Sequence, residues 1–230
     1  MFWDALDRPR HDLLCRIVKN MPVPGSYLAG GTALALMLGH RKSIDFDWFS
    51  PEQFDPEQLY YRLSSLGRTR IAETRQGTFH GFVRDIRITW LHYPNPLLEP
   101  LIAAEDVPGF FLASLKDIAV MKWVAVSSRG ARKDFIDLYS ICRSGCDLEE
   151  LLSVLPHKYP GADINSYHMV KSLSYFDDAE REVMPVMLKD ISWQSVKEYF
   201  LARQKRLLNR IKISGKSAPF TSGHSENGRR

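Results

Sequence analysis

The sequence predicts an α/β (α+β) fold in which a core with a mixed β-sheet is followed by a C-terminal helical domain. Short apolar segments separated by turn residues alternate with helical patterns up to about residue 108. Residues 94–108 contain four prolines, which favour a loop. Beyond this loop, apolar residues recur mainly at helical spacing. We therefore expect a core over residues 1–108, a helical domain over 109–213 and a disordered basic tail over 214–230.

Local patterns predict the elements of the core. Apolar residues at helical spacing predict a helix over residues 3–20. Asp55-Pro56 is typical of an N-cap followed by proline in the first helical turn, so a second helix should run to about Leu66. Strands are expected at residues 27–29, 44–48, 68–75, 78–83 and 86–93, with Gly77 and Gly81 at turns between the last three.

Residues 27–49 are the segment around which the rest is arranged. A short strand leads into the Gly30-Gly31-Thr32 turn, a short helix over 33–38, and then a strand that contains Asp45 and Asp47. Side chains alternate along a strand, so these two carboxylates share a face and can converge on a divalent cation. A glycine turn that opens a helix offers free N–H groups to an anion. A turn suited to phosphate beside two carboxylates suited to a metal ion indicates metal-dependent phosphate chemistry.

Each of these signals has a plainer explanation when it stands alone. Most glycine pairs only make turns, and most Asp-x-Asp pairs are solvated charge. Here the aspartates alternate with Ile44, Phe46 and Trp48, and the strand follows closely on the glycine turn. The combination favours a functional site.

The helix expected over residues 115–127 is apolar on most sides but carries Lys122 within its packing face. An ammonium group there is costly unless it has a partner or points into a cleft, and the alternative is a lysine that reaches out to solvent. The following helix, residues 133–143, places Asp134 in its first turn, where the helix dipole favours a carboxylate. Asp137 lies deeper, between Ile136 and Leu138, so a purely structural role explains it less easily.

Two groups of basic residues are candidates for nucleic-acid contacts, against the alternative of ordinary solvated surface. The formal net charge of +4 is compatible with a polyanionic partner but too small to require one. The first group lies between the two helices just described and the second on the final helix; they are Arg129, Arg132 and Lys133, and Arg203, Lys205 and Arg206.

The motifs resemble the nucleotidyltransferase superfamily (DNA polymerase β-like), whose members share a Gly-Gly or Gly-Ser turn followed by Asp-x-Asp. Within it, the chain looks like the AbiEii/AbiGii toxin family, including MenT-like toxins. The resemblance covers about residues 20–145. It rests on Gly30-Gly31-Thr32-Ala33-Leu34, His40, Arg41, Ser43, Asp45 and Asp47, and on a second block of Met121-Lys122, Arg129 and Lys133 to Tyr139.

The resemblance implies that NMP is transferred from an NTP to an acceptor, with tRNA 3′ ends as the acceptor in at least some members. It also implies a toxin of a type IV-like toxin–antitoxin or phage-defence pair, with a cognate antitoxin as partner. The alternatives are transfer to a protein hydroxyl, or a catalytically silent relative that binds nucleotide or antitoxin. In the enzyme, Asp45 and Asp47 would hold Mg²⁺ (or Mn²⁺), and Asp134 or Asp137 would orient Lys122 or act on the attacking hydroxyl. The nucleotide would be held by Gly30, Gly31, Thr32, Arg41, Ser43 and Lys122.

The resemblance also raises a question, since polymerase-like members usually bring a third carboxylate from a following strand. On the strand expected over residues 86–93, Arg87 and Thr89 fill the central positions of the relevant face. Only Asp85, at the very start, could serve, and we expect it simply to open the strand.

Other features narrow the class of protein. The cysteines Cys15, Cys142 and Cys146 are odd in number and form no pair of zinc-binding motifs, which favours reduced thiols. No apolar run approaches the about 18 residues of a membrane span, and residues 1–8 are not a signal peptide. We expect a cytoplasmic protein without a membrane partner.

Overall fold

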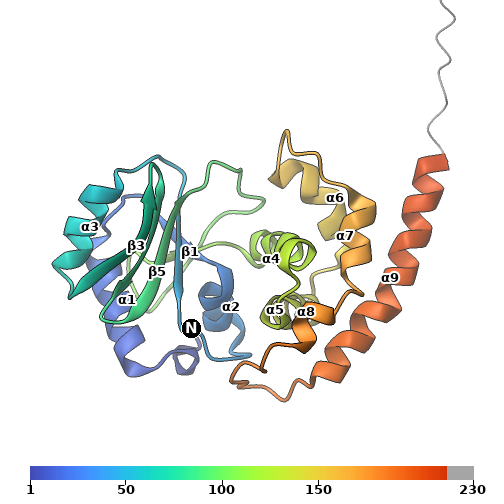
Figure 1. Ribbon diagram of the computed structural model, residues 1–230, viewed down its shortest axis with the longest axis horizontal. Coiled ribbons are helices and arrows are strands. Elements are labelled where there is room, and N and C mark those ends of the chain that lie inside the picture. The colour runs from blue at the N-terminus through green and yellow to red at the C-terminus, as the bar shows by residue number, and fades with distance from the viewer. Residues whose placement is uncertain (217–230) are drawn as a thin grey trace, which may run out of the picture.

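The computed structural model describes residues 1–216, with side chains up to residue 209. In this part of the chain a mixed sheet of seven strands has the order β3-β4-β5-β2-β1-β7-β6. Figure 1 shows α1 and α3 on one side of the sheet and α2 and α4 on the other, with the remaining helices beyond α4. The predicted class, a mixed sheet followed by helices, is confirmed.

The centre of the sheet is built from β1, β2 and β5. Strand β1 (Tyr27–Ala29) pairs antiparallel with β2 (Phe46–Ser50), and β2 pairs parallel with β5 (Ile86–His92). Strands β3 (Thr69–Arg75) and β4 (Thr78–Val83) extend the sheet from β5 as an antiparallel meander. On the other side, β7 (Phe111–Leu112) pairs parallel with β1, and β6 (Ile102–Ala103) lies at the edge.

The helices follow their local signals closely. Asp7 and Asp55 cap α1 and α3 by accepting hydrogen bonds from backbone N–H groups, and a proline occupies the first turn of each helix. Ser114 caps α4 in the same way. The bounds are α1 Arg8–Asn20, α2 Gly30–Leu38, α3 Pro56–Ser64, α4 Leu115–Arg129, α5 Arg132–Arg143, α6 Leu148–Lys158, α7 Ser166–Ser172, α8 Asp177–Glu180 and α9 Trp193–Lys216, with a short 3₁₀ turn at Trp3–Ala5.

Three local expectations are corrected. The helix after the glycine turn begins at Gly30 rather than at residue 33, because both glycines take part in its first turn. Asp45 immediately precedes β2 instead of lying within the strand. Gly81 lies inside β4, opposite Ile88, so only Gly77 stands at a turn of the meander.

The two faces of the sheet have different coverage. On one face, the stacked indoles of Trp48 and Trp90, 5.1 Å apart, belong to the main core together with Phe79. On the opposite face α2 packs on β1 and β2, and α4 and α5 pack on α2 in turn. The start of β2, where Asp47 lies, is therefore at the junction between the sheet and the helical half.

Between the predicted core and the predicted helical domain, residue 108 falls between β6 and β7, so the sheet extends to Leu112. The division into domains stays a prediction. The expected disordered tail lies outside the described residues from 217 onward, and residues 214–216 belong to α9. No helix of the described chain combines the length and apolar character needed to cross a membrane.

Candidate functional site

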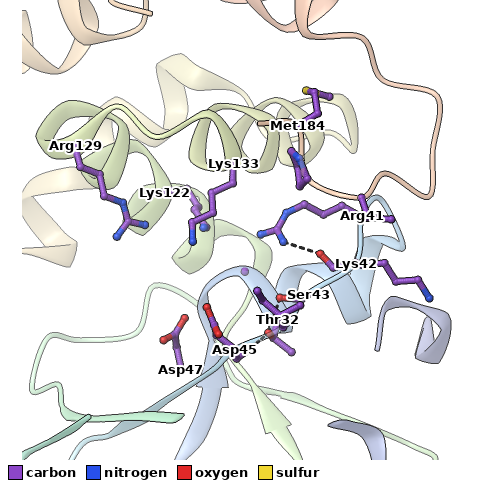
Figure 2. A pocket seen from close by; sticks show the side chains of 14 residues that line it. Thr32, Arg41, Lys42, Ser43, Asp45, Asp47, Lys122, Arg129, Lys133 and Met184 are labelled. Carbon is purple, nitrogen blue, oxygen red and sulfur yellow. Dashed lines mark hydrogen bonds between the residues drawn. The ribbon is translucent and has the colours of Figure 1, made fainter. Parts of the chain in front are cut away.

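A pocket of about 300 Å³ opens where α2 begins, between the sheet and helices α4 and α5. Figure 2 shows Arg129, Lys122 and Lys133 pointing from these helices toward Asp45 and Asp47. Segments far apart in the chain line it: Gly31, Thr32, Arg41, Lys42, Ser43, Ile44, Asp45, Asp47, Lys122, Arg129, Lys133, Met184, Pro185 and Val186.

Glycine is required at both positions of the turn that starts α2. Gly30 has φ +66°, and a Cβ atom there would lie 2.8 Å from Oδ2 of Asp47. A Cβ at Gly31 would lie 2.5 Å from Nη2 of Arg41. The missing side chains thus allow a carboxylate and a guanidinium group to approach the N-terminus of a helix, where N–H groups are free for an anion.

Hydroxyl groups attach the segment before β2 to the first turn of α2. The buried Oγ atoms of Thr32 and Ser43 lie 2.7 Å apart, and Thr32 also donates to the carbonyl oxygen of Asp45. The backbone N–H of Ser43 donates to the carbonyl of Ala5 at 2.9 Å. These bonds fix the approach to Asp45 against the start of the helix.

Asp45 and Asp47 are the acidic side chains of the pocket. No hydrogen bond or ion pair joins either carboxylate to another residue in the described part of the chain. Burial raises the pKa of Asp47 and the neighbouring Asp45 raises it further, while Lys122, Lys133 and Arg87 act in the opposite direction. Burial therefore disfavours the ionised form of Asp47 by more than the surrounding cations favour it.

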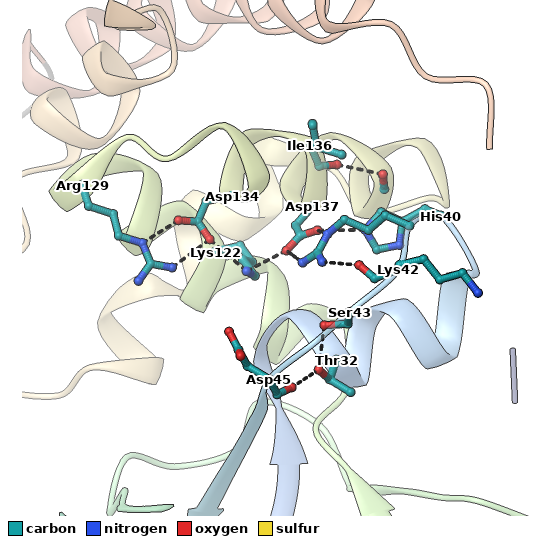
Figure 3. A network of polar contacts seen from close by, with 12 residues as sticks. Thr32, His40, Lys42, Ser43, Asp45, Lys122, Arg129, Asp134, Ile136 and Asp137 are labelled. Atoms are coloured by element: carbon teal, nitrogen blue, oxygen red, sulfur yellow. Dashed lines mark hydrogen bonds and ion pairs between the residues drawn. The ribbon is translucent and has the colours of Figure 1, made fainter. Parts of the chain in front are cut away.

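Behind the pocket, Asp137 is the centre of a buried ionic network (Figure 3). Its carboxylate is 0% exposed and accepts two hydrogen bonds from Arg41, at 2.7 and 2.8 Å. Nε2 of His40 lies 2.8 Å from Oδ1. Burial alone would raise the pKa of Asp137, but Arg41 and Lys122 outweigh it and hold that pKa well below its ordinary value.

Lys122 links this network to a second carboxylate. Its Nζ lies 2.7 Å from Asp137 and 2.9 Å from Asp134, and the side chain is only 7% exposed. Burial lowers the pKa of Lys122, but the two carboxylates raise it by more, so the ammonium stays charged. Arg129 holds Asp134 from the other side through bonds of 2.6 and 3.0 Å. Burial raises the pKa of Asp134, yet Lys122 and Arg129 bring it below its ordinary value.

The network decides between the alternatives left open for these residues. Lys122 does not reach out to bulk solvent, since it is paired and also faces the pocket. Asp134 and Asp137 do not line the pocket and are fully buried against cations. The geometry therefore favours a role in orienting Lys122 over direct contact with an attacking hydroxyl.

A third carboxylate does not join the pair. Thr89 of β5 is the residue directly opposite Asp47, and Asp85 lies in the β4–β5 hairpin turn with φ +65°. Within residues 1–216, no cluster of three His, Cys, Asp or Glu side chains is placed to hold a metal ion.

The basic residues separate into two sets. Arg129 and Lys133 line the pocket, whereas Arg132 lies over the Trp193 ring and donates to the carbonyl of Ala179 on α8. The three candidates on α9 do not line the pocket: Arg203 lies over the Tyr199 ring, Arg206 pairs with Glu149, and Lys205 is exposed. Whether they contact nucleic acid stays a prediction.

Sequence reasoning missed one wall of the pocket. Residues 184–186 lie 139 to 141 positions after Asp45 in the chain, yet the N–H of Lys42 donates to the carbonyl of Val186 at 2.8 Å. A β-bridge between Arg41 and Met187 continues this pairing. His40 appeared in the motif but was not expected to contact Asp137. No local pattern signals either contact.

Two solved structures from Helicobacter pylori share this fold. The crystal structure of JHP933 has a TM-score of 0.58 and 16% identity, over 92% of this chain and 97% of that chain. A protein described as a "putative nucleotidyltransferase from H. pylori" has a TM-score of 0.56 and 16% identity, over 89% of this chain and 96% of that one. The likeness establishes that this chain shares the fold of these two proteins; the activity has to be argued from the site.

Among curated proteins, the uncharacterized protein aq_aa25 of Aquifex aeolicus (strain VF5) is 41% identical over an alignment of 208 residues that covers 88% of this chain and 98% of the relative. The chain belongs to the same family as this protein. No protein-family model matches the chain.

Proposed function

We propose that the protein is a nucleotidyltransferase that transfers a nucleoside monophosphate from an NTP to an acceptor hydroxyl. One observation carries the proposal: the glycine turn that opens α2, the carboxylates of Asp45 and Asp47, and the cations Lys122 and Lys133 meet in a single pocket. A triphosphate is bound by N–H groups and cations along its length, and phosphoryl-type transfer depends chiefly on such positioning and charge stabilisation.

Asp45 and Asp47 fit a hard divalent cation such as Mg²⁺ or Mn²⁺. Mg²⁺ is usually held by one or two protein carboxylates, with waters and substrate phosphates completing its coordination, so a third protein ligand is not required. Among the described residues neither carboxylate has a hydrogen bond or an ion pair, so both are available as ligands. When bound, the cation would neutralise charge on the triphosphate and on the leaving pyrophosphate.

The other residues of the pocket would bind the nucleotide. The N–H groups at Gly31 and Thr32 and the hydroxyl of Ser43 would hold phosphate oxygens at the start of α2. Lys133 is exposed and has no ion pair among the described residues, so it is free for a phosphate. Lys122 keeps its charge through Asp134 and Asp137 and would stabilise negative charge that develops on the phosphates.

In the reaction, the oxygen of the acceptor hydroxyl forms a bond to the α-phosphorus. The bond from that phosphorus to the bridging oxygen breaks, and its electron pair leaves with pyrophosphate. The hydroxyl proton passes to water, since Asp134 and Asp137 lie behind the pocket with their charges held by cations.

The motif resemblance to the AbiEii/AbiGii toxins supports the 3′ end of tRNA as the acceptor. It also supports a cytoplasmic toxin that is neutralised by a cognate antitoxin protein. A second candidate is a silent relative that binds nucleotide without transferring it. The presence of Thr89, rather than a carboxylate, beside Asp47 favours that alternative.

A transfer assay separates these functions. Purified protein is incubated with Mg²⁺, with NTPs labelled at the α-phosphate, and with total RNA or lysate protein as acceptor. We expect label on RNA, lost on chelation and in Asp47→Asn, and retained in the control Asp163→Asn, whose carboxylate is exposed and away from the pocket. Label on protein alone would identify a protein hydroxyl as the acceptor, and NTP binding without label would establish the silent relative.

A further inference from the structure

One face of the sheet continues from Asp47 across β5, β4 and β3, and it is exposed at Arg87 and Arg70. The register places Asp47 opposite Thr89 on β5, and Thr89 opposite His80 on β4. The adjacent row of the same face contains Arg87 of β5, Phe82 of β4 and Arg70 of β3.

Alternation along the strands shows which face this is. Trp48 and Trp90, the neighbours of Asp47 and Thr89, stack on each other in the core on the other side of the sheet. Helix α3 packs on β3 and β4 there, through the buried side chains of Leu59 and Leu63. The face with Thr89 and Arg87 therefore looks toward the same side as the pocket.

The chemistry of this face is cationic and aromatic. The guanidinium carbon of Arg70 lies 4.5 Å from the centre of the half-buried Phe82 ring. Arg70 and Arg87 are exposed, and in the described chain neither guanidinium has a hydrogen bond or an ion pair. The only carboxylate in these two rows besides Asp47 is Glu73, opposite His80 at the far end.

We infer that this face, defined by Arg70, Phe82 and Arg87, binds the single-stranded end of a polynucleotide acceptor. The inference rests on the proposed function and assigns the acceptor side of the same site. Arginines without partners complement backbone phosphates, and an aromatic ring beneath a guanidinium group is a platform on which a base can stack. With strands about 4.8 Å apart, the row from Arg87 to Arg70 spans about 10 Å, and it lies next to the row that contains Asp47. A terminal hydroxyl bound there would arrive at the carboxylates from the side opposite to Ser43 and the start of α2.

A protein acceptor is disfavoured by the same features. An acidic protein surface would use both arginines but would leave the stacked Phe82 and Arg70 pair without a function. A polynucleotide uses all three side chains.

Direct binding tests the inference without NTP. A short single-stranded RNA labelled with a fluorophore is titrated with the protein, and anisotropy gives the dissociation constant. Arg70→Ala/Arg87→Ala should bind at least tenfold more weakly, and the slope of log affinity against log salt should fall by about 1.4, since each phosphate contact in a single strand contributes about 0.7. Phe82→Leu keeps an apolar side chain without the ring, and should weaken binding by about fivefold or more.

The matched control removes two charges from the opposite side of the sheet. Arg8 and Lys19 are exposed on α1, so Arg8→Ala/Lys19→Ala should bind RNA as the wild type does. Circular dichroism checks that each variant is folded.

The outcomes separate the inference from the proposed function. Wild-type affinity in the double variant, failure of the wild type to bind RNA, or equal competition by a polyglutamate peptide would each overturn the inference. If RNA binds through this face but no nucleotide is transferred, the inference stands and the proposed function fails. If RNA is labelled and both variants keep the wild-type Michaelis constant for RNA, the proposed function stands and the inference fails.

Discussion

Two buried ionic clusters hold α4 in place, and they make different use of similar chemistry. Near the start of the helix, Asp117 lies 2.5 Å from Nζ of Lys158, and both side chains are 0% exposed. Asp117 also accepts hydrogen bonds from the hydroxyl of Ser114 and from the N–H of Leu98. This cluster joins the loop before β6 to helices α4 and α6.

The second cluster, around Asp137, joins α5 to α4 and to the segment that follows α2, and it also opens onto the pocket. Lys122 and Arg41 pair with Asp137 and line the cavity, whereas neither Asp117 nor Lys158 does so. A buried ion pair is therefore not in itself a sign of function. A buried ion pair indicates a functional site only where one of its charged side chains also lines a cavity.

The largest effect is expected from Asp137→Ala. This change leaves Arg41, Lys122 and His40 buried without their shared carboxylate. Removing one partner of a buried pair typically costs about 3–5 kcal/mol, and three groups lose a partner here. We expect the free energy of unfolding, measured by urea denaturation, to fall by at least that amount. A loss below about 1 kcal/mol would show that the network is not a unit.

A second comparison exchanges the lysines of the two clusters for methionine. Lys122→Met leaves Asp134 and Asp137 without one cation, and Lys158→Met does the same to Asp117. Both variants should lose about 3 kcal/mol of stability. At a temperature where both are folded, only Lys122→Met should lose nucleotide transfer. Equal loss of transfer in Lys158→Met would remove the functional distinction between the clusters.

Substitution of the pocket carboxylates Asp45 and Asp47 should affect activity strongly and stability little, the opposite of what is expected for the paired carboxylate of Asp137. Asp45→Asn or Asp47→Asn should reduce transfer by more than about a hundredfold, as expected for a ligand of a catalytic metal. Metal-free stability should hardly change, and it should rise slightly in Asp47→Asn, because burial disfavours the ionised form of this side chain. Transfer above about a hundredth of the wild-type rate would contradict the metal site.

Asp137 and Asp47 should also affect the pH dependence of stability in opposite directions, with smaller effects than the substitutions above. The pKa of Asp137 is lowered in the folded state, so its contribution is fully present above the unfolded value of about 3.9 and is lost as pH falls toward the folded pKa. Asp47 has a raised pKa, so its effect has the opposite sign: stability falls as pH rises above about 3.9 through its folded pKa. Thermal unfolding between about pH 3 and pH 7 measures both. Asp137→Asn should flatten the acid side of the profile, and Asp47→Asn should not.

The smallest effect is expected from the basic face of α9. Neutralising Arg203, Lys205 and Arg206 together should raise the Michaelis constant for RNA modestly and leave that for NTP unchanged. The reason is that these side chains lie away from the pocket and two of them already contact Tyr199 and Glu149. If unlabelled bulk RNA competes equally against the triple variant and the wild type, α9 is only a solvated surface.

Much of the fold follows from signals within a few residues of one another. The alternation of β5 and the aspartate caps of α1 and α3 predict their elements directly. The glycine turn and the carboxylates of Asp45 and Asp47 lie within 18 residues of chain, so their proximity is also readable locally. Where the local reading failed, at Gly81, strand pairing outweighed the turn preference of glycine.

The chemical groups of the candidate site can be predicted from the sequence: a glycine turn that opens a helix, two carboxylates, and a lysine that needs an acidic partner. How these groups combine depends on the packing of the whole chain. It placed Thr89 beside Asp47, joined His40 to Asp137 across 97 positions, and brought residues 184–186 to the pocket. It also turned Arg132 toward α8 rather than the pocket. Local patterns predict the structure that a segment forms with its neighbours in the chain. The contacts just described depend instead on which strands and helices pack together. That packing is determined by burial of the whole core.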